Sequence, residues 1–257
     1  AAGNANGRTF AFRPTPGEFC VTSAPRSRAR RCMFTVAGET PAMARWGNYR
    51  ALGDSVSTMR RDASDLTFDS PTWSWTDRVA LAVESVARLR GEAAQGCSLA
   101  SPGATVEQLV HDQVPRALEA GADLVTILIG TSELLDGSAR PAALARRLES
   151  GVRTLTAAGV DVVLATCLNP PTAIVPRRRR VRTAEFTAEL WSIARTHDAS
   201  VVDAWSLRDA RLRPLGTGDR VHLGEEGHRQ LGTRAVHVLG LPFVELGGRP
   251  RASAAGG

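Results

Sequence analysis

The segment at residues 124–129, Leu-Val-Thr-Ile-Leu-Ile, is apolar on both of the faces that an extended chain presents. This pattern is typical of a central strand in a parallel sheet, because helices cover both sides of such a sheet. Gly130 follows directly and ends the segment. Parallel strands need crossover connections of a dozen or more residues, usually helices, so this strand predicts strand–helix units before and after it.

Strand-like and helix-like segments do alternate along the rest of the chain. The other expected strands are residues 49–52, 94–99, 160–167 and 199–203. The expected helices are residues 72–90, 105–113, 141–158, 183–196 and 225–239, several with apolar side chains at three- and four-residue spacing. Pro115 is expected to interrupt or kink the second helix. The alternation predicts an α/β fold with three layers, α/β/α, around a five-stranded parallel sheet.

The remaining segments are expected to lie outside this domain or between its elements. Residues 1–45 mix Gly, Pro, Arg, Ser and Thr without a sustained period, which predicts a disordered tail. The domain is expected at 46–240, with a long loop at 58–72 and a C-terminal tail at 241–257. No apolar run approaches the roughly 18 residues of a membrane span, so none is predicted.

The basic charge of the chain is concentrated near its start. The formal net charge is +6. Residues 1–42 hold six arginines against Glu18 and Glu39, a balance of +4, and the rest of the chain contributes +2. The expected domain is therefore nearly neutral, and nucleic-acid binding is not predicted; it would show a steep salt dependence.

The four cysteines, Cys20, Cys32, Cys97 and Cys167, have no close CxxC spacing, so neither a metal site nor a cofactor is predicted. Cys97 and Cys167 are expected to be buried free thiols. Cys20 and Cys32 form a disulfide only if the chain is exported. Residues 1–42 show no charged start followed by an apolar segment, which favours a cytoplasmic protein and leaves secretion open.

Ser55 lies where the first expected strand ends in small and polar residues, Gly53-Asp54-Ser55. A serine between a strand and a helix can expose its hydroxyl and leave its backbone N–H free, as a nucleophile requires. The tripeptide alone is equally typical of an ordinary turn. A nucleophile also needs a base and an acid that orients the base.

His222 is the histidine best placed to be that base. It follows the fifth expected strand in a predicted loop, and Asp219 precedes it by three residues, a separation at which a tight turn can bring a carboxylate to the far ring nitrogen. The other histidines fall on expected helices or helix ends, where a solvated imidazole is the simpler interpretation: His111, His197, His228 and His237.

A serine in a Gly-Asp-Ser turn after the first strand, with Asp-x-x-His near the end of an α/β chain, resembles the SGNH hydrolases, also called the GDSL esterase/lipase family. The resemblance covers about residues 46–240. It implies a flavodoxin-like fold with Ser55 as nucleophile, His222 as base and Asp219 as orienting acid. It also implies that the backbone N–H groups of Ser55 and Gly103, the latter in the block Ser101-Pro102-Gly103, stabilise the oxyanion.

One block departs from this family's pattern. The third motif reads Gly-x-Asn-Asp in the family, and its asparagine supplies a further oxyanion donor. Residues 130–133 read Gly-Thr-Ser-Glu here, so Ser132 stands in the asparagine's place with a shorter donor. Val56 stands where the name-giving leucine would be, an exchange of one apolar residue for another.

The family resemblance implies a serine esterase that cleaves a carboxylic ester of a lipid, an acylated sugar or a small molecule. Ser132 keeps open the alternative of a weak or inactive relative that binds an acylated or glycosylated ligand. The arginines at 177–180, with Arg182, are either a solvated loop or a clamp for an anionic group of the substrate. Trp73 and Trp75 either line a pocket or pack in the core. The oligomeric state is not indicated.

Overall fold

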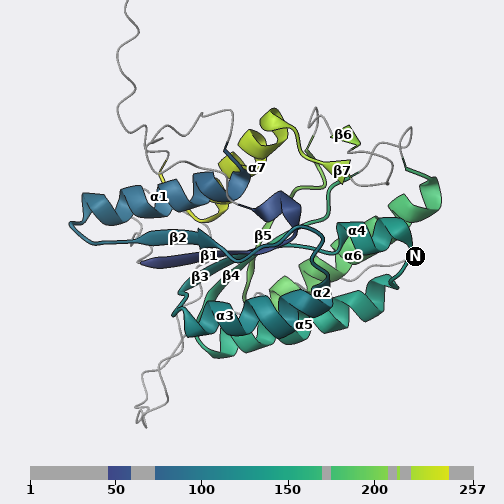
Figure 1. Cartoon of the computed structure of the whole chain (residues 1–257), viewed down its shortest axis with the longest axis horizontal. Coiled ribbons are helices and arrows are strands. Elements are labelled where there is room, and N and C mark those ends of the chain that lie inside the picture. Colours follow the sequence, from purple (N-terminus) through teal and green to yellow (C-terminus); the bar gives the residue numbers. More distant parts are fainter. Residues whose placement is uncertain (1–45, 59–72, 170–174, 208–212, 215–220, 243–257) are drawn as a thin grey trace, which may run out of the picture. The chain divides into compact units, whose positions relative to one another are not determined.

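The computed structural model describes residues 46–58, 73–169, 175–207, 213–214 and 221–242 (Figure 1). These residues belong to one compact unit, residues 42–257. The predicted tail at 1–45, most of the loop expected at 58–72 and all but the first two residues of the tail expected at 241–257 lie outside the described residues.

Five parallel strands form the central sheet, as predicted. They are β1 (Asn48–Gly53), β2 (Gln95–Ser98), β3 (Leu124–Leu128), β4 (Asp161–Ala165) and β5 (Ser200–Val202), in the order β2-β1-β3-β4-β5. Because all pairs are parallel, the carboxyl ends of the strands meet at one edge of the sheet. Ligands of such sheets bind at that edge.

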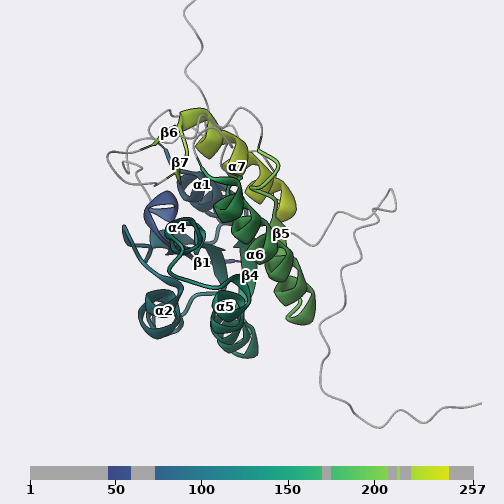
Figure 2. The same ribbon diagram turned by 90° about the vertical axis from the view of Figure 1, so that its right-hand side faces the viewer.

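Helices cover both faces of the sheet (Figures 1 and 2). They are α1 (Trp75–Leu89), α2 (Val106–Gln108), α3 (Val114–Glu119), α4 (Thr131–Asp136), α5 (Pro141–Ala157), α6 (Arg177–Thr196) and α7 (Glu225–Val238). The α1 and α7 helices pack on one face, and α2, α3, α5 and α6 pack on the other. Side chains of β3 alternate between the two cores: Leu124 and Leu128 face α1 and α7, and Val125 and Ile127 face α5.

Pro115 changes the second helix without ending it. A π-helical segment, Leu109–Gln113, joins α2 to α3, and Pro115 is the second residue of α3. The N–H of Val114 donates to the C=O of Leu109, the wide turn that defines a π-helix. Since proline has no N–H to donate, a change in the hydrogen-bond pattern just before it lets the helical path continue.

Three other expectations need correction. The arginines at 177–180 form the first turn of α6 and are not a loop, because arginine favours helices without adding the apolar period that marks one. Residues 130–133 were expected in a loop after the central strand, but Gly130 precedes α4 (Thr131–Asp136) and the other three residues form its first turn. His222 was expected in a loop, but its backbone lies in a two-residue strand, β7 (Val221–His222), antiparallel to β6 (Arg213–Pro214).

Two side chains are placed differently from their predicted environments. Cys97 is exposed, because β2 is the edge strand of the sheet, whereas Cys167 is buried as predicted; both are free thiols. His228 on α7 is buried, and its Nδ1 accepts a hydrogen bond of 3.3 Å from the N–H of Trp75. The prediction of a solvated imidazole was wrong there because α7 packs its His228 face against the start of α1.

Candidate active site

Ser55 is the first residue of a short 3-10 turn, Ser55–Ser57, that directly follows β1. Asp54 caps this turn: its Oδ1 accepts from the N–H of Val56 at 3.0 Å, and its C=O accepts from the N–H of Ser57 at 3.0 Å. Ser55 is half-buried, and the two residues after it are buried. The structure therefore confirms the turn at a strand end that the sequence predicted. Residues 53–57, which contain the predicted nucleophile Ser55, are called the nucleophile turn below.

Gly53 begins the nucleophile turn in a conformation that requires glycine. Its φ is +136°, and a Cβ there would lie 2.2 Å from the carbonyl oxygen of Leu128 on β3. The end of the turn is held from two sides, because the C=O of Ser57 accepts from the hydroxyls of Ser98 at 3.1 Å and Thr76 at 3.2 Å. The end of β2 and the start of α1 thus fix where the turn leaves the sheet.

Gln113 is a residue at this site that the sequence analysis missed. Its side chain is buried, its Oε1 accepts from the N–H of Gly53 at 2.7 Å, and its Nε2 donates to the C=O of Gly53 at 2.9 Å. Gln113 belongs to no motif. The available signal was a polar residue on a helix face otherwise expected to be apolar.

The loop that carries Gly103 lies beside the nucleophile turn. The N–H of Ser101 donates to the C=O of Gly53 at 3.2 Å, and a tight turn follows in which the N–H of Ala104 donates to the C=O of Ser101. Gly103 is exposed within that turn. Thr105 then caps α2 through a reciprocal pair of hydrogen bonds with Gln108. The structure thus brings the predicted Gly103 block to the carboxyl edge, next to β1.

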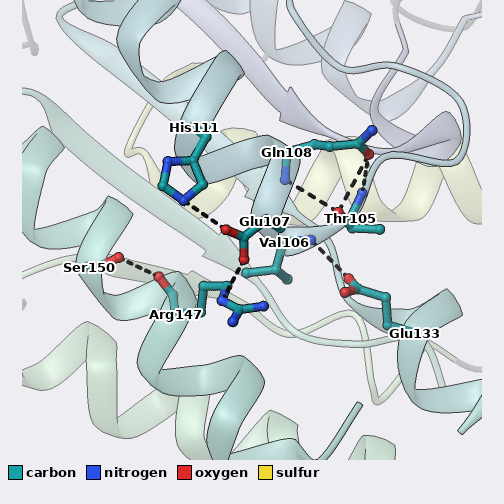
Figure 3. Close-up of polar contacts among 8 residues, drawn as sticks. All are labelled: Thr105, Val106, Glu107, Gln108, His111, Glu133, Arg147 and Ser150. Carbon is teal, nitrogen blue, oxygen red and sulfur yellow. Dashed lines mark hydrogen bonds and ion pairs between the residues drawn. The ribbon is translucent and has the colours of Figure 1, made fainter. Parts of the chain in front are cut away.

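Glu133 connects this loop to the block that contains Ser132 (Figure 3). Its Oε2 accepts from the N–H of Val106 at 2.9 Å, so the first turn of α4 is tied to the first turn of α2. Burial raises the pKa of the Glu133 carboxyl above its ordinary value, the hydrogen bond from Val106 counteracts this, and the charge of Asp54 adds to the rise. Ser132, one residue earlier, is exposed.

A second set of contacts fastens α2 to α5 (Figure 3). Glu107 accepts from Arg147 Nε at 2.7 Å, and His111 Nε2 lies 2.8 Å from the other oxygen of the same carboxylate. His111 is thus an exposed helix residue, as expected. These contacts lie at the surface, where an ion pair adds little stability, so they orient α2 more than they strengthen the fold.

The structure describes the predicted base only in part. The backbone of His222 pairs with Arg213, and Leu223 after it is buried in the core that α1 and α7 share. Asp219 lies outside the described residues. The structure therefore brings Ser55, Gly103 and Ser132 to the carboxyl edge of the sheet, and the places of Asp219 and His222 in the triad stay predictions.

Arg180 differs from the exposed arginines Arg177 and Arg178 of the same helical turn. Its Nε donates to the Oδ1 of Asn169 at 2.7 Å, and its guanidinium lies 5.7 Å from the centre of the Trp205 ring. Asn169 follows β4 and Trp205 follows β5, so both contacts hold the guanidinium near the carboxyl edge of the sheet.

The remaining candidate residues are buried. Trp73 and Trp75 are both inaccessible, and Trp75 packs in the α1–α7 core, which confirms the core interpretation for it. Cys167 follows β4, and burial raises the pKa of its thiol to about 12, with the hydroxyls of Thr131 and Thr187 opposing the rise. A thiol with this pKa is protonated at neutral pH and is not a second nucleophile.

Two further properties concern only the described residues. Within them, no group of three or more His, Cys, Asp and Glu side chains is arranged to hold a metal ion. None of the helices that the structure describes has the length and apolar character needed to cross a membrane.

The sequence matches the model of the GDSL-like lipase/acylhydrolase family over residues 51–230. No curated protein matches it significantly. Solved structures with the same fold include TesA, at TM-score 0.55 and 20% identity over 75% of this chain and 97% of that chain. A catalytic mutant of Axe2, an acetylxylan esterase from Geobacillus stearothermophilus, gives TM-score 0.59 and 17% identity, with 77% and 96% covered. The lipase/acylhydrolase from Enterococcus faecalis has a TM-score of 0.55 and 21% identity, over 76% of this chain and 96% of that chain.

Proposed function

Because the chain belongs to the GDSL-like lipase/acylhydrolase family, and is therefore a carboxylic ester hydrolase, we propose that it cleaves its substrate through an acyl-enzyme on Ser55. The observation that carries this proposal is the place of Ser55. It opens a capped turn at the end of β1, at the edge of the sheet where ligands bind, and it is partly accessible. The catalytic domain is residues 46–240.

His222 and Asp219 complete the mechanism. The Ser55 oxygen attacks the ester carbonyl carbon while His222 takes the proton of the Ser55 hydroxyl. His222 then gives that proton to the departing alcohol. Asp219 holds the imidazole in the required tautomer. Water, deprotonated by the same imidazole, then attacks the acyl carbon; the acid leaves, and the imidazolium returns the proton to the Ser55 oxygen. In Axe2, the catalytic mutants replaced a serine, an aspartate and a histidine three positions after the aspartate. Asp219 and His222 have the same separation, which supports the assignment.

The negative charge on the carbonyl oxygen is stabilised by the backbone N–H groups of Ser55 and Gly103 and by the hydroxyl of Ser132. The hydrogen bond from Ser101 to Gly53 supports this arrangement, since it joins the Gly103 loop to the nucleophile turn. Ser132 is also the observation that favours the second candidate, a weak or inactive relative that binds an acylated or glycosylated ligand, because its hydroxyl reaches less far than an asparagine carboxamide.

The substrate is a small ester with an anionic group, which the arginines at the start of α6 receive. Positive charge is disfavoured at the N-terminus of a helix, which carries the positive end of the helix dipole. The first turn of α6 nevertheless contains arginines and no acidic residue. A bound anion would compensate both the positive end of the dipole and the charge of the arginines. Arg180 also supports an anionic substrate, because its contacts with Asn169 and Trp205 fix its guanidinium before the substrate binds.

A fluorophosphonate probe and a panel of chromogenic esters with graded acyl length test the proposal. The wild type should be labelled once, at Ser55. The Ser55→Ala variant should lose labelling and lose on the order of 10⁴-fold or more of its ester hydrolysis. Ser192→Ala, which changes an exposed serine on α6, is the matched control and should behave as wild type. Labelling that persists unchanged in Ser55→Ala contradicts the assignment. Ligand binding without any turnover by the wild type would favour the second candidate.

A further inference from the structure

We propose that Gln113 is a positioning residue for catalysis, whose carboxamide fixes the start of the nucleophile turn and thereby the direction of Ser55. The inference rests on the proposed role of Ser55 as nucleophile. Gln113 touches neither substrate nor reacting atoms in this scheme; it acts through the backbone of Gly53.

The carboxamide of Gln113 binds the backbone of Gly53 at the point where β2 has ended. The β2 strand ends at Ser98, opposite Ala51 of β1. Beyond that point no residue of β2 is in register with Gly53, whose strand partner is Leu128 of β3 on the other side. The loop after β2 still contributes one hydrogen bond, from the N–H of Ser101 to the C=O of Gly53 at 3.2 Å. The side chain of Gln113 meets both the N–H and the C=O of Gly53, at 2.7 and 2.9 Å, as a neighbouring peptide would.

The hydrogen bonds from Gln113 act on a residue whose backbone is intrinsically flexible. Glycine has the greatest conformational freedom of any residue. Gly53 adopts φ +136°, and β3 leaves no room for a side chain there. The Asp54 cap and the hydroxyls that bind the Ser57 carbonyl hold the turn from Ser55 onward. Gln113 holds it before Ser55, so the nucleophile is fixed from both directions.

The helix that carries Gln113 is itself altered at this point. Gln113 is the last residue of the π-helical segment, and π-helical turns occur frequently at functional sites. Within that segment Leu109 and Gln113 are buried, whereas His111 and Asp112 are exposed. A buried carboxamide must find partners for both its donor and its acceptor, and one residue of the nucleophile turn supplies both.

The substitution Gln113→Glu makes the role testable through pH. An ionised carboxylate can accept from the N–H of Gly53 but repels its C=O, whereas a protonated carboxyl both accepts and donates, as the carboxamide does. Burial, the facing carbonyl and the adjacent Asp54 all raise the pKa of the introduced carboxyl. The kcat of Gln113→Glu relative to wild type should therefore be lowered about 10–10²-fold at pH 8 and should recover as the pH falls towards 5.5. KM should change little.

The ratio to wild type removes the pH dependence of kcat that both proteins share. The matched control is Gln95→Glu, the same exchange at an exposed position at the amino end of β2, and its ratio should stay near one at every pH. Gln113→Met keeps the length of the side chain but offers neither hydrogen bond, so its loss of kcat should not depend on pH. The melting temperature of each variant at each pH shows that folded protein is compared, and the rate of fluorophosphonate labelling should follow kcat.

The outcomes separate this inference from the proposed function. If Ser55→Ala abolishes labelling while Gln113→Glu and Gln113→Met keep the wild-type kcat at pH 8, Gln113 has no positioning role. A rise in KM at constant kcat would likewise overturn it. If labelling survives Ser55→Ala, the nucleophile assignment fails first, whatever Gln113 does.

Discussion

Replacing Gly53 with alanine tests how closely the nucleophile turn depends on the packing of β1 against β3. The new Cβ would lie 2.2 Å from the carbonyl oxygen of Leu128 and 2.9 Å from the hydroxyl of Ser57. The hydroxyl can rotate away, but the carbonyl belongs to the backbone of β3, in register with Gly53. The strands must therefore separate or the turn must move.

The structure allows the cost of Gly53→Ala to be estimated. A residue other than glycine at φ +136° is strained by about 1–3 kcal/mol. Overpacking in a rigid environment adds about 1–3 kcal/mol. The sum is about 2–6 kcal/mol of the free energy of unfolding, a large part of the roughly 5–15 kcal/mol that a domain has. At about 4 kcal/mol the melting temperature falls by about 8–16 °C.

Gly159→Ala is the matched control for the backbone strain alone. Gly159 follows α5 with φ +85°, and a Cβ there would have no atom within 4 Å. It should cost about 1 kcal/mol, or about 2–4 °C in melting temperature, and leave activity unchanged. Thermal unfolding by circular dichroism measures both variants, and fluorophosphonate labelling below both melting temperatures reports on Ser55. Gly53→Ala should be labelled far more slowly than Gly159→Ala.

Two results would refute this reasoning. Equal loss of stability in Gly53→Ala and Gly159→Ala would show that the Leu128 carbonyl leaves room for a Cβ at position 53. A Gly53→Ala protein labelled at the wild-type rate would show that the position of Ser55 does not depend on the backbone before it.

Two further predictions concern the oxyanion and the substrate. Ser132→Ala should lower kcat with little change in KM, and Ser132→Asn should raise kcat above wild type. The upper limit of either change is the ~10²–10³-fold in kcat that one good oxyanion donor contributes. If both variants have the wild-type kcat, position 132 does not face the oxyanion. Arg180→Gln should raise KM about 10–10²-fold for negatively charged esters and not for neutral ones, because a charged hydrogen bond contributes about 1.5–3 kcal/mol. The control Arg178→Gln, at an exposed position, should have a smaller effect; equal effects of Arg180→Gln on both ester classes would show that these arginines only face solvent.

The three inner strands β1, β3 and β4 were predictable from sequence because burial on both faces leaves an apolar signature, as at 124–129. The edge strands β2 and β5 are less buried, and they were predicted from their places between helical segments. The start of α6 was not, because four consecutive arginines carry no apolar period although each favours a helix. The exposure of Cys97 depends on the order of strands in the sheet, which local sequence does not contain. The contact between Gln113 and Gly53 spans 60 residues and arises only once the second helix has packed beside β1.

The side chains that hold the candidate site together are not the one that departs from the family's pattern, Ser132. Glu133, and not Ser132, makes the bond to Val106 that ties α4 to α2. Ser132 is exposed one residue earlier, so its exchange for another side chain leaves that tie in place. The hydrogen bonds of Gln113 and Ser101 to Gly53 are equally independent of position 132. The donor that we propose at position 132 can therefore vary in strength while the nucleophile turn and the Gly103 loop stay assembled, so we expect a serine there to be compatible with esterase activity.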